Sequence, residues 1–529
     1  MKKAYYPLLI ACALSALVFV NYQVLAHSQV ARVNDEGSRI YSGFRFYDLL
    51  FKNNAASFAR KLDRLTTLSK EAAHPRFYEF TEALAWKGLE AAGVRDEEWV
   101  ILVANTFFLL ILFLSIYGIG ALLYGRGAGF LAALLVSMFP YVFAHSRVAM
   151  LDFPLTSMVS LSFFLLLKTR GFQSAYYSVC AGILFGVSQL TKESAVIFIF
   201  PVLAYYVIDS LAASGPGPKK KAFLNFLLAL GAFAIVAGSV YLRVKNQHVF
   251  ATYLAKSSIH GKAVQSFYLK NLIDCVGPIV LFLSLPLCLN YLINFRKREK
   301  FFFFWFFVPL ALLTLSPNKA VRFMLPIMPA FALIVAQEIF RDDLLQKFRR
   351  SCSLLLILAS ILQYALFNYG ALTYSQGEKK RVSMEAGILC AQKEEYMPAL
   401  FAMLKVFKKE MPVSEGSDKI LFLCNLGELY TPLKLELRLS RLPFAVSCPM
   451  EPDAVDTRHQ QSTDWCQQVL AAGYIVEKPG DMGVIREHNY KIAQELSGCF
   501  AEYKGRFKTI AQIASPDGAV IYIHKRITP

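Results

Sequence analysis

A few charged residues that interrupt an otherwise apolar sequence have types and spacings suited to group transfer. Asp35 and Glu36 form a carboxylate pair soon after the first long apolar segment, and Asp152 lies about one turn inside a later one. Cations recur near the ends of other apolar segments, at Arg147, Lys192, Lys319 and Arg322. A carboxylate can take a proton from an acceptor hydroxyl as a general base. Arg and Lys can bind a phosphate and stabilise its charge as it leaves.

Each of these residues also has a structural explanation. A carboxylate pair beside an apolar segment is common in solvated loops. Asp152 has Arg147 five residues earlier as a partner across the turn, and Lys192 has the character of a loop lysine whose ammonium reaches the interface. A carboxylate inside a membrane helix costs ~2.5–3.5 kcal/mol on insertion scales and usually faces a cavity. A functional role is therefore favoured over a structural one only if these residues lie on the same side of the protein.

The composition is that of a membrane protein. Of the 529 residues, 56% are hydrophobic and only 18% are charged, which no ordinary soluble domain needs. About eleven apolar segments are long enough to cross a bilayer as helices, at ~20 residues per span. They comprise residues 6–26, 99–123, 127–145, 150–167, 174–191, 194–211, 222–242, 271–295, 301–316, 321–340 and 351–371. The sequence predicts an α-helical polytopic membrane protein with a transmembrane domain over residues 1–371.

The net charge of +18 is carried by short basic clusters between the apolar segments. Such clusters are topology signals and contacts to lipid phosphates, so no nucleic-acid partner is expected. Clusters such as Lys219-Lys220-Lys221 lie on connections that share the side of the N-terminus, which the positive-inside rule places in the cytoplasm. An odd number of spans then puts residues 372–529 outside. The first loop (27–98) and the charged residues named above fall on the same outer face.

Two regions outside the apolar segments have patterns of their own. Within the first loop, residues 41–52 and 77–89 are predicted to form helices that lie in the headgroup plane and wall the site. The tail, 372–529, is predicted to be a small extracytoplasmic α/β domain that binds the acceptor or caps the site. Its strands are expected at residues 419–424, 444–448, 474–476 and 519–524, and its helices at 399–409 and 464–472.

The cysteines and histidines bear on compartment and metal binding. Five of the ten cysteines lie in the tail, where a disulfide such as Cys448–Cys466 is compatible with an oxidising compartment. The remaining five are read as small apolar side chains within the spans. The histidines are scattered and show no metal-ligand spacing, so no metal site is assigned, although a divalent cation is left open.

Four motifs occur together in one order and on one side of the predicted topology. They are Asp35-Glu36 after the first apolar segment, Arg147-x-x-x-x-Asp152-x-Pro154-Leu155, Gly182-x-x-x-Gly186 leading to Leu190-Thr191-Lys192, and Lys319-x-x-Arg322-Phe323-x-Leu325-Pro326. Over about residues 1–345 the chain therefore resembles the membrane glycosyltransferases of the GT-C superfamily. Within it, the chain is most similar to the branch of protein O-mannosyltransferases and the bacterial lipid A aminoarabinose transferase.

The first loop adds to this resemblance and departs from it. His74-Pro75-Arg76-Phe77-Tyr78 is similar to the His-Pro-Pro-Leu segment of that branch, with Arg76 in place of its second proline. The aromatic residue that follows Asp-Glu in the branch comes later here, at Tyr41. These departures concern the acceptor more than the reaction class.

The resemblance implies a reaction and roles for the charged residues. Family members take a sugar from a polyprenyl-phosphate donor on the outer face and use an aspartate of the first loop as base. By that resemblance Asp35 is the base, Glu36 supports it and Asp152 positions groups in the cavity. The implied donor-phosphate contacts are Arg147, Lys192, Lys319 and Arg322. The resemblance favours a bacterial inner (plasma) membrane location.

The sequence leaves two function classes open. The first is an inverting glycosyltransferase that moves a sugar from a lipid-linked donor to a protein, lipid or glycan acceptor, with membrane lipids around it. The second is a multi-span transporter or flippase of a lipid-linked or anionic substrate, which predicts internal repeats and polar groups near mid-bilayer in broken helices. No clear repeat is present, and the one-sided charge favours the transferase. The identities of the sugar and acceptor are left open.

Overall fold

The computed structural model describes residues 5–27, 34–52, 75–94, 97–213, 216–241, 266–295, 300–316, 319–341, 346–368, 397–410, 418–423, 433, 444–447, 464–479, 487–515 and 519–527. The chain forms two compact units. Unit 1 comprises Met1–His27 and Gly43–Ala391, and unit 2 comprises Ser28–Ser42 and Gln392–Pro529. The domain boundary predicted at residue 371 lies outside the described residues.

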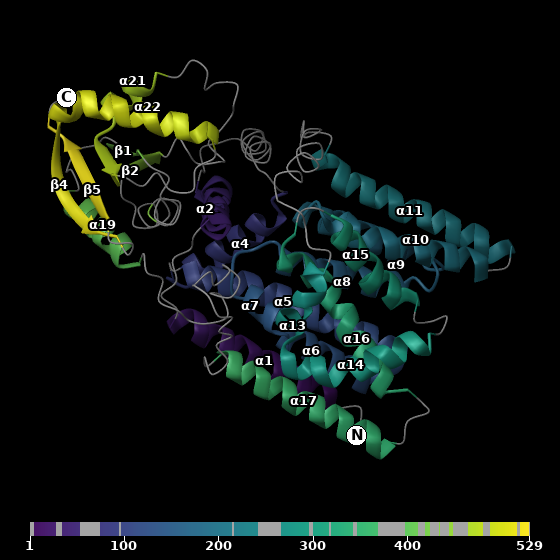
Figure 1. Cartoon of the computed structure of the whole chain (residues 1–529). Helices are drawn as coiled ribbons and strands as arrows, with labels where there is room; N and C mark the ends of the chain where they lie inside the picture. The colour runs from purple at the N-terminus through teal and green to yellow at the C-terminus, as the bar shows by residue number, and fades with distance from the viewer. Residues whose placement is uncertain are drawn as a thin grey trace. The chain divides into compact units, whose positions relative to one another are not determined.

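Unit 1 is a bundle of apolar helices, in which α5, α6, α8, α9 and α16 pack against one another (Figure 1). Each of the predicted apolar segments is helical over most of its length. The helices of the bundle are α1 (Tyr5–His27), α5 (Glu97–Tyr124), α6 (Arg126–Met138), α7 (Pro140–His145), α8 (Asp152–Lys168), α9 (Ala175–Thr191), α10 (Ala195–Ala213), α11 (Pro216–Tyr241), α13 (Phe267–Val276), α14 (Pro278–Ile293), α15 (Lys300–Leu315), the 3₁₀ helix η3 (Val321–Ile327), α16 (Met328–Ile339) and α17 (Gln346–Asn368).

Fewer helices than eleven are long and apolar enough to cross a membrane individually. Among the described residues six qualify, and α13 with α14 makes a seventh if that pair, bent by 115°, is counted as one span. Helices α6 and α15 are apolar but shorter. The six qualifying segments are Tyr5–Leu25, Trp99–Tyr124, Ala195–Ala212, Gly217–Gly238, Val321–Ile339 and Lys347–Asn368. The expected count of eleven spans is therefore not confirmed, because several apolar runs are divided between two shorter elements.

The bend between α13 and α14 shows how a broken helix is accommodated. Gly277, at a φ of 85°, adopts the left-handed backbone that ends α13. Side-chain amide groups of Gln363 on α17 replace the interrupted helical hydrogen bonds. Gln363 Nε2 donates to the carbonyl of Val276 at 2.9 Å, and its Oε1 accepts from the backbone N–H groups of Ile279 and Val280 at 3.1 and 3.3 Å. The break is thus closed by protein groups, as an apolar environment requires.

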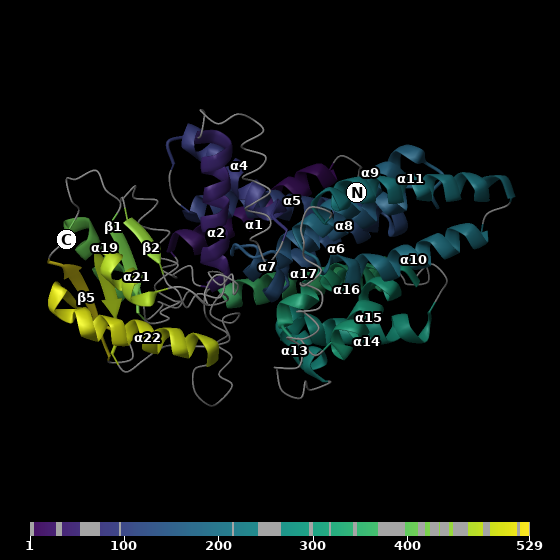
Figure 2. The ribbon, with the colours of Figure 1, turned by 90° about the horizontal axis from the view of Figure 1, so that it is seen from above.

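Helices α9 and α11 lie side by side (Figure 2) and approach closely at two glycines. A Cβ atom on Gly182 would collide with the backbone carbonyl of Ala229, and one on Gly186 would lie 2.7 Å from the Cβ of Val236. Small residues at this spacing let membrane helices pack backbone to backbone. The Gly182-x-x-x-Gly186 motif therefore fixes the position of α9, whose end carries Lys192.

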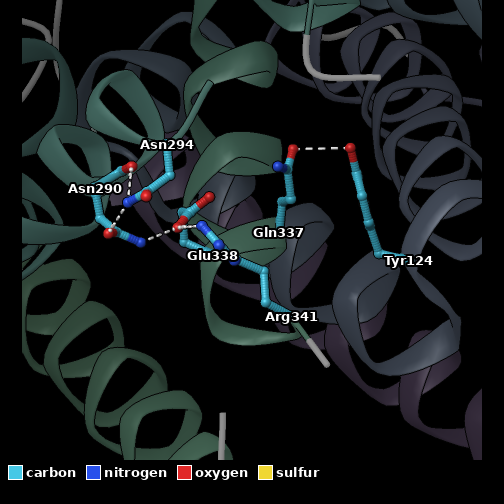
Figure 3. A network of polar contacts seen from close by, with 6 residues as sticks. All are labelled: Tyr124, Asn290, Asn294, Gln337, Glu338 and Arg341. Atoms are coloured by element: carbon cyan, nitrogen blue, oxygen red, sulfur yellow. Dashed lines mark hydrogen bonds and ion pairs between the residues drawn. The ribbon is translucent and has the colours of Figure 1, made fainter. Parts of the chain in front are cut away.

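Polar side chains around the buried residues Gln337 and Glu338 join α5, α14 and α16 at the end of the bundle where these helices stop (Figure 3). Tyr124 Oη donates to Gln337 Oε1 at 2.8 Å. Glu338 Oε2 accepts from Asn290 Nδ2 at 2.5 Å and from Arg341 Nη1 at 3.0 Å. Glu338 is 1% exposed. These bonds offset the desolvation of Oε2, whereas Oε1 is buried without a hydrogen-bond partner among the described residues.

The first loop contributes two elements to unit 1. Helix α4 (Phe77–Ala91) packs on α5, and the C-terminal part of α2 (Asn34–Tyr47), with the π-turn Asp48–Lys52 after it, packs on α4. Phe44 and Tyr47 contact Trp86, with ring centroids 5.3 and 6.4 Å apart. Gly43 provides the room, because a Cβ there would overlap the Glu82 side chain. Residues 77–89, for which an apolar stripe was predicted, are helical, and one side of this helix is buried.

Unit 2 contains a five-stranded sheet in the order β2-β1-β3-β5-β4. Strands β1, β2 and β3 are parallel, whereas β5 pairs antiparallel with β3 and β4. The elements are α19 (Met397–Lys409), β1 (Asp418–Phe422), β2 (Phe444–Ser447), α21 (Trp465–Ala471), β3 (Tyr474–Glu477), α22 (Glu487–Tyr503), β4 (Phe507–Ala514) and β5 (Val520–Arg526). Side chains such as Phe407 of α19 and Phe500 of α22 are buried against the strands. The small α/β fold predicted for the tail is confirmed.

One disulfide ties two helices of unit 2. Cys466 on α21 is bonded to Cys499 on α22, with Cα atoms 5.1 Å apart. The proposed pairing of Cys466 with Cys448 is therefore wrong. The reason is geometric: α21 and α22 pack against each other, which brings these two cysteines within disulfide range.

The α9–α11 contact gives a test of the fold. We expect Gly182→Ala to lower the stability of the full-length protein by about 1–3 kcal/mol, because overpacking forces the two backbones apart. Thermal unfolding in detergent measures this change. Gly231→Ala on α11 is the matched control, since a Cβ there meets no atom within 4 Å, and alanine favours a helix over glycine. Equal melting temperatures for both variants would contradict the close-packing interpretation.

Candidate active site

Three of the predicted site residues form one buried cluster. Asp152 Oδ1 accepts a hydrogen bond from Lys192 Nζ at 2.6 Å, and Arg322 Nε lies 3.8 Å from Asp152 Oδ2. Asp152 and Lys192 are 2% and 5% exposed, whereas the Arg322 side chain keeps 31% of its surface exposed. Among the described residues, two cations face this one carboxylate, and Arg322 is the more exposed of the two cations.

The cluster forms because three chain breaks meet at one end of the bundle. Asp152 is the first residue of α8, Lys192 is the residue at which α9 ends, and Arg322 lies in η3. Lys192 has an extended backbone, with φ −159° and ψ 138°, which turns the chain before α10 begins at Ala195. α8 contacts both α9 and η3. Ion pairs at helix ends leave the apolar middle of the bundle undisturbed.

Phe323 is the aromatic side chain next to both cations of the cluster. The Lys192 Nζ lies 5.1 Å from the centroid of its ring, and the Arg322 Cζ lies 5.9 Å from it. Contacts of this kind are attractive because a cation interacts with the negative face of an aromatic ring. Phe323 therefore helps to hold the two cations beside Asp152.

Arg147 is buried at the same end of the bundle but binds other partners. Its Nε donates to Asn21 Oδ1 on α1 at 2.8 Å, and its Nη2 donates to the Tyr364 hydroxyl on α17 at 3.4 Å. Asn21 Nδ2 in turn donates to Ser146 Oγ at 2.9 Å. The structural alternative in which Asp152 pairs with Arg147 is therefore wrong, since Asp152 pairs with Lys192 and Arg322. Within the described part of the chain, Arg147 Nη1 is buried without a hydrogen-bond partner.

Lys319 has a structural role in the described residues. Its Nζ donates to the carbonyls of Leu313 at 2.9 Å and of Thr314 at 2.5 Å, so it caps the C-terminal end of α15. The ammonium also lies 5.2 Å from the centroid of the Tyr268 ring. Partial burial lowers the pKa of Lys319 from its ordinary value. Its assignment as a phosphate contact stays a prediction.

Asp35 and Glu36 lie in the first turn of α2. Their side chains fall outside the described residues. Their assignment as base and supporting carboxylate therefore stays a prediction from the sequence.

The structure adds buried polar groups that the sequence interpretation missed. Tyr78 Oη donates to Asn105 Oδ1 at 3.1 Å, and Asn105 Nδ2 donates to the carbonyl of Val148 at 2.9 Å. Glu79 and Glu82 on α4 are also fully buried, and Glu79 pairs with Arg76 at 3.2 Å. The signal was present in the sequence, because two carboxylates three positions apart on an otherwise apolar helix face have to find partners. These residues connect α4 and α5 to the turn that precedes Asp152.

Metal binding has no support among the described residues, because no group of three or more His, Cys, Asp or Glu side chains is placed there to hold an ion.

The comparisons with known proteins agree with this architecture. Residues 82–241 match the family model described as dolichyl-phosphate-mannose-protein mannosyltransferase. The structure of ArnT from Cupriavidus metallidurans bound to undecaprenyl phosphate is similar, with a TM-score of 0.65 and 13% identity over 99% of this chain and 98% of that one. A sequence comparison with curated proteins finds no match.

Two structures of the oligosaccharyltransferase of Archaeoglobus fulgidus are also similar. The complex of AglB with an inhibitory peptide and a dolichol-phosphate has a TM-score of 0.53 at 12% identity, over 98% of this chain and 74% of that one. The complex with Zn and sulfate has a TM-score of 0.51 at 13% identity, over 96% and 72% of the two chains. At such identities these likenesses concern the fold. Together with the family model, they confirm the resemblance to the GT-C superfamily.

The buried ion pair can be tested by a double-mutant cycle. We expect Asp152→Asn alone, or Lys192→Met alone, to destabilise the protein by about 3–5 kcal/mol, because each removes the hydrogen-bonded partner of a buried charge. The double variant Asp152→Asn with Lys192→Met should recover much of that loss. Thermal unfolding of the full chain in detergent measures the cycle. Additive losses in the double variant would show that the two side chains do not interact.

Proposed function

We propose that the chain is a membrane glycosyltransferase that moves a sugar from a polyprenyl-phosphate carrier to an acceptor hydroxyl at the outer face of the membrane. The observation that carries this proposal is the cluster of Asp152, Lys192 and Arg322. Its two cations, one of them a partly exposed guanidinium, suit an anion at the depth of lipid headgroups. The family-model match and the similar folds support the same reaction class.

The proposed chemistry uses the charged residues on both sides of the sugar. Asp35 takes the proton of the acceptor hydroxyl, with Glu36 supporting it, and the acceptor oxygen attacks the anomeric carbon. The bond from that carbon to the phosphate oxygen breaks, and the carrier phosphate leaves with the electron pair. Arg322 stabilises the leaving phosphate, with Arg147, Lys192 and Lys319 as further contacts. Attack opposite the leaving group inverts the configuration of the anomeric carbon.

In this mechanism Asp152 is a positioning residue. Its carboxylate holds Lys192 and Arg322 in place before a ligand arrives, so their reorganisation cost at the moment of reaction is small. The same two cations without a fixed carboxylate would lose this order through mutual repulsion. Asp152 therefore contributes by keeping the cations at fixed positions.

The disulfide supports the outer-face assignment. Disulfides form and persist in oxidising compartments, and the Cys466–Cys499 bond lies in unit 2. Basic clusters on the opposite connections favour the same orientation under the positive-inside rule. We therefore propose that unit 2 and the cluster around Asp152 are extracytoplasmic, in a bacterial inner membrane.

A transporter or flippase is less well supported. That class predicts broken helices whose free backbone groups bind a substrate or ion. The break between α13 and α14 is a broken helix of this kind, but its free backbone donors and acceptor are already hydrogen-bonded to Gln363. The charged cluster, moreover, lies at helix ends.

The base assignment predicts the effect of one substitution. Asp35→Asn should lower the rate of sugar transfer by about 10²–10⁴-fold, which is the usual contribution of a general base. Mass analysis of envelope glycans and lipids with and without the protein first identifies the product, and transfer is then timed in membranes supplied with the lipid-linked donor. Asp48→Asn, in the same loop, is the matched control, since it removes a carboxylate that lies 3.6 Å from Lys52 and has no assigned role in the reaction. Transfer at the wild-type rate would exclude Asp35 as the base.

The phosphate assignment predicts a binding defect. Arg322→Gln should weaken binding of the polyprenyl-phosphate donor by about 10- to 100-fold, the effect of losing a charge-assisted hydrogen bond. Lys87→Gln removes an exposed cation of α4 that pairs with Glu90, and it should leave donor affinity unchanged. Binding of a labelled donor to the purified protein measures both. Unchanged affinity in Arg322→Gln, with a normal melting temperature, would remove this residue from the donor site.

A further inference from the structure

A groove of about 730 Å³ lies at the end of the bundle opposite to Asp152. Its walls are the first half of α1, the second half of α5, the start of α6 and the end of α8. This volume is within the roughly 300–1,000 Å³ of small-molecule sites. The lining residues are Tyr6, Pro7, Ile10, Ala11, Leu14, Leu114, Tyr117, Gly118, Ala121, Leu122, Arg126, Phe164 and Lys168.

The lining residues of the groove are apolar along its depth and cationic at its mouth. Arg126 is the first residue of α6, and Lys168 is the last residue of α8, so both charges lie where helices end. No carboxylate is among the described residues that line the groove. The Lys168 Nζ lies 5.5 Å from the centroid of the Phe164 ring, which is part of the wall. The mouth of the groove is therefore positively charged and its depth is apolar.

The length of the groove matches one leaflet of a bilayer. From Leu114 to Leu122, α5 rises about 12 Å at 1.5 Å per residue, against roughly 15 Å for half of the hydrocarbon core. Gly118 shapes the wall at mid-depth, because a Cβ there would lie 2.5 Å from Phe164 Cε2. The absence of a side chain lets the Phe164 ring lie close to the α5 backbone.

We propose that this groove binds an anionic glycerophospholipid of the surrounding leaflet, with the phosphate at Arg126 and Lys168 and an acyl chain along α1 and α5. Basic pockets between membrane helices on the cytoplasmic side are suited to acidic headgroups, and the groove lies on the side that the basic connections assign to the cytoplasm. This site is separate from the cluster around Asp152, and its occupant is a leaflet lipid rather than the sugar carrier.

The test is native mass spectrometry of the purified, delipidated full chain in detergent, titrated with phosphatidylglycerol or with phosphatidylethanolamine of the same acyl chains. Wild-type protein should bind phosphatidylglycerol more tightly. Arg126→Gln with Lys168→Gln should lower that affinity by about fivefold for each cation removed. The same double variant should lower binding of phosphatidylethanolamine less, because the ammonium of that headgroup offsets its phosphate charge. Equal binding of both lipids by the wild type, or unchanged affinity in the double variant, would overturn the proposal.

Lys219→Gln with Lys220→Gln is the matched control. These lysines are exposed at the start of α11, and the carbonyl of the adjoining Pro218 accepts a hydrogen bond from Gln173 at 3.2 Å, which places them at the same end of the bundle as Lys168. The control should bind phosphatidylglycerol as the wild type does. A loss equal to that of the groove variant would overturn the proposal by showing a general charge effect.

A second variant tests the apolar part of the groove. Leu114→Trp fills the groove from a side chain that is 48% exposed, so folding should be preserved, and binding of both lipids should fall. A competition experiment identifies the occupant. If equimolar undecaprenyl phosphate displaces bound phosphatidylglycerol from the wild type, and the groove variants bind neither lipid, the occupant is the carrier and the proposal is overturned.

Discussion

The hydrogen-bonded ion pair between Asp152 and Lys192 is the interaction on which the organisation of the candidate site depends. Neither side chain tolerates burial alone, because an unpaired charge in an apolar bundle costs several kcal/mol. The pair therefore requires the start of α8 to stay against the end of α9. Arg322 is then held by the remaining carboxylate oxygen. The close packing of α9 on α11 through Gly182 and Gly186 further fixes the position of α9.

Much of this arrangement could be predicted from the sequence, because charges in apolar segments are rare enough to stand out. Asp152, Lys192 and Arg322 were expected on one side and do lie together. The partner of Arg147 could not be predicted. Asn21 is one polar residue within an apolar helix, and nothing in the sequence indicates which residue its side chain contacts. The count of eleven spans stays unconfirmed, because breaks such as Gly277 lie inside apolar runs and divide them into shorter helices. Strand β4 was missed, although the other strands of unit 2 were predicted.

The bundle uses different polar chemistry at its two ends. At one end Asp152 faces Lys192 and Arg322, and the Arg322 side chain is partly exposed. At the other end Glu338 accepts hydrogen bonds from Asn290 and Arg341 through Oε2, while its Oε1 is buried without a hydrogen-bond partner among the described residues. Buried hydrogen bonds of the second kind rigidify a structure, whereas a partly exposed cation is suited to an anionic ligand. In the proposed function the end with Asp152 binds the donor, whereas the end with Glu338 holds α5, α14 and α16 together.

The capping of α15 by Lys319 would couple the end of that helix to the donor if Lys319 contacts the phosphate as proposed. The ammonium donates to the carbonyls of Leu313 and Thr314, and a phosphate that drew it away would leave both carbonyls without this donor. Ligand occupancy and fraying of the last turn of α15 are then linked equilibria, and such linkage is reciprocal. A helix terminus that loosens when the phosphate arrives, and re-forms when it departs, would let a spectroscopic label near Thr314 follow turnover without touching the sugar.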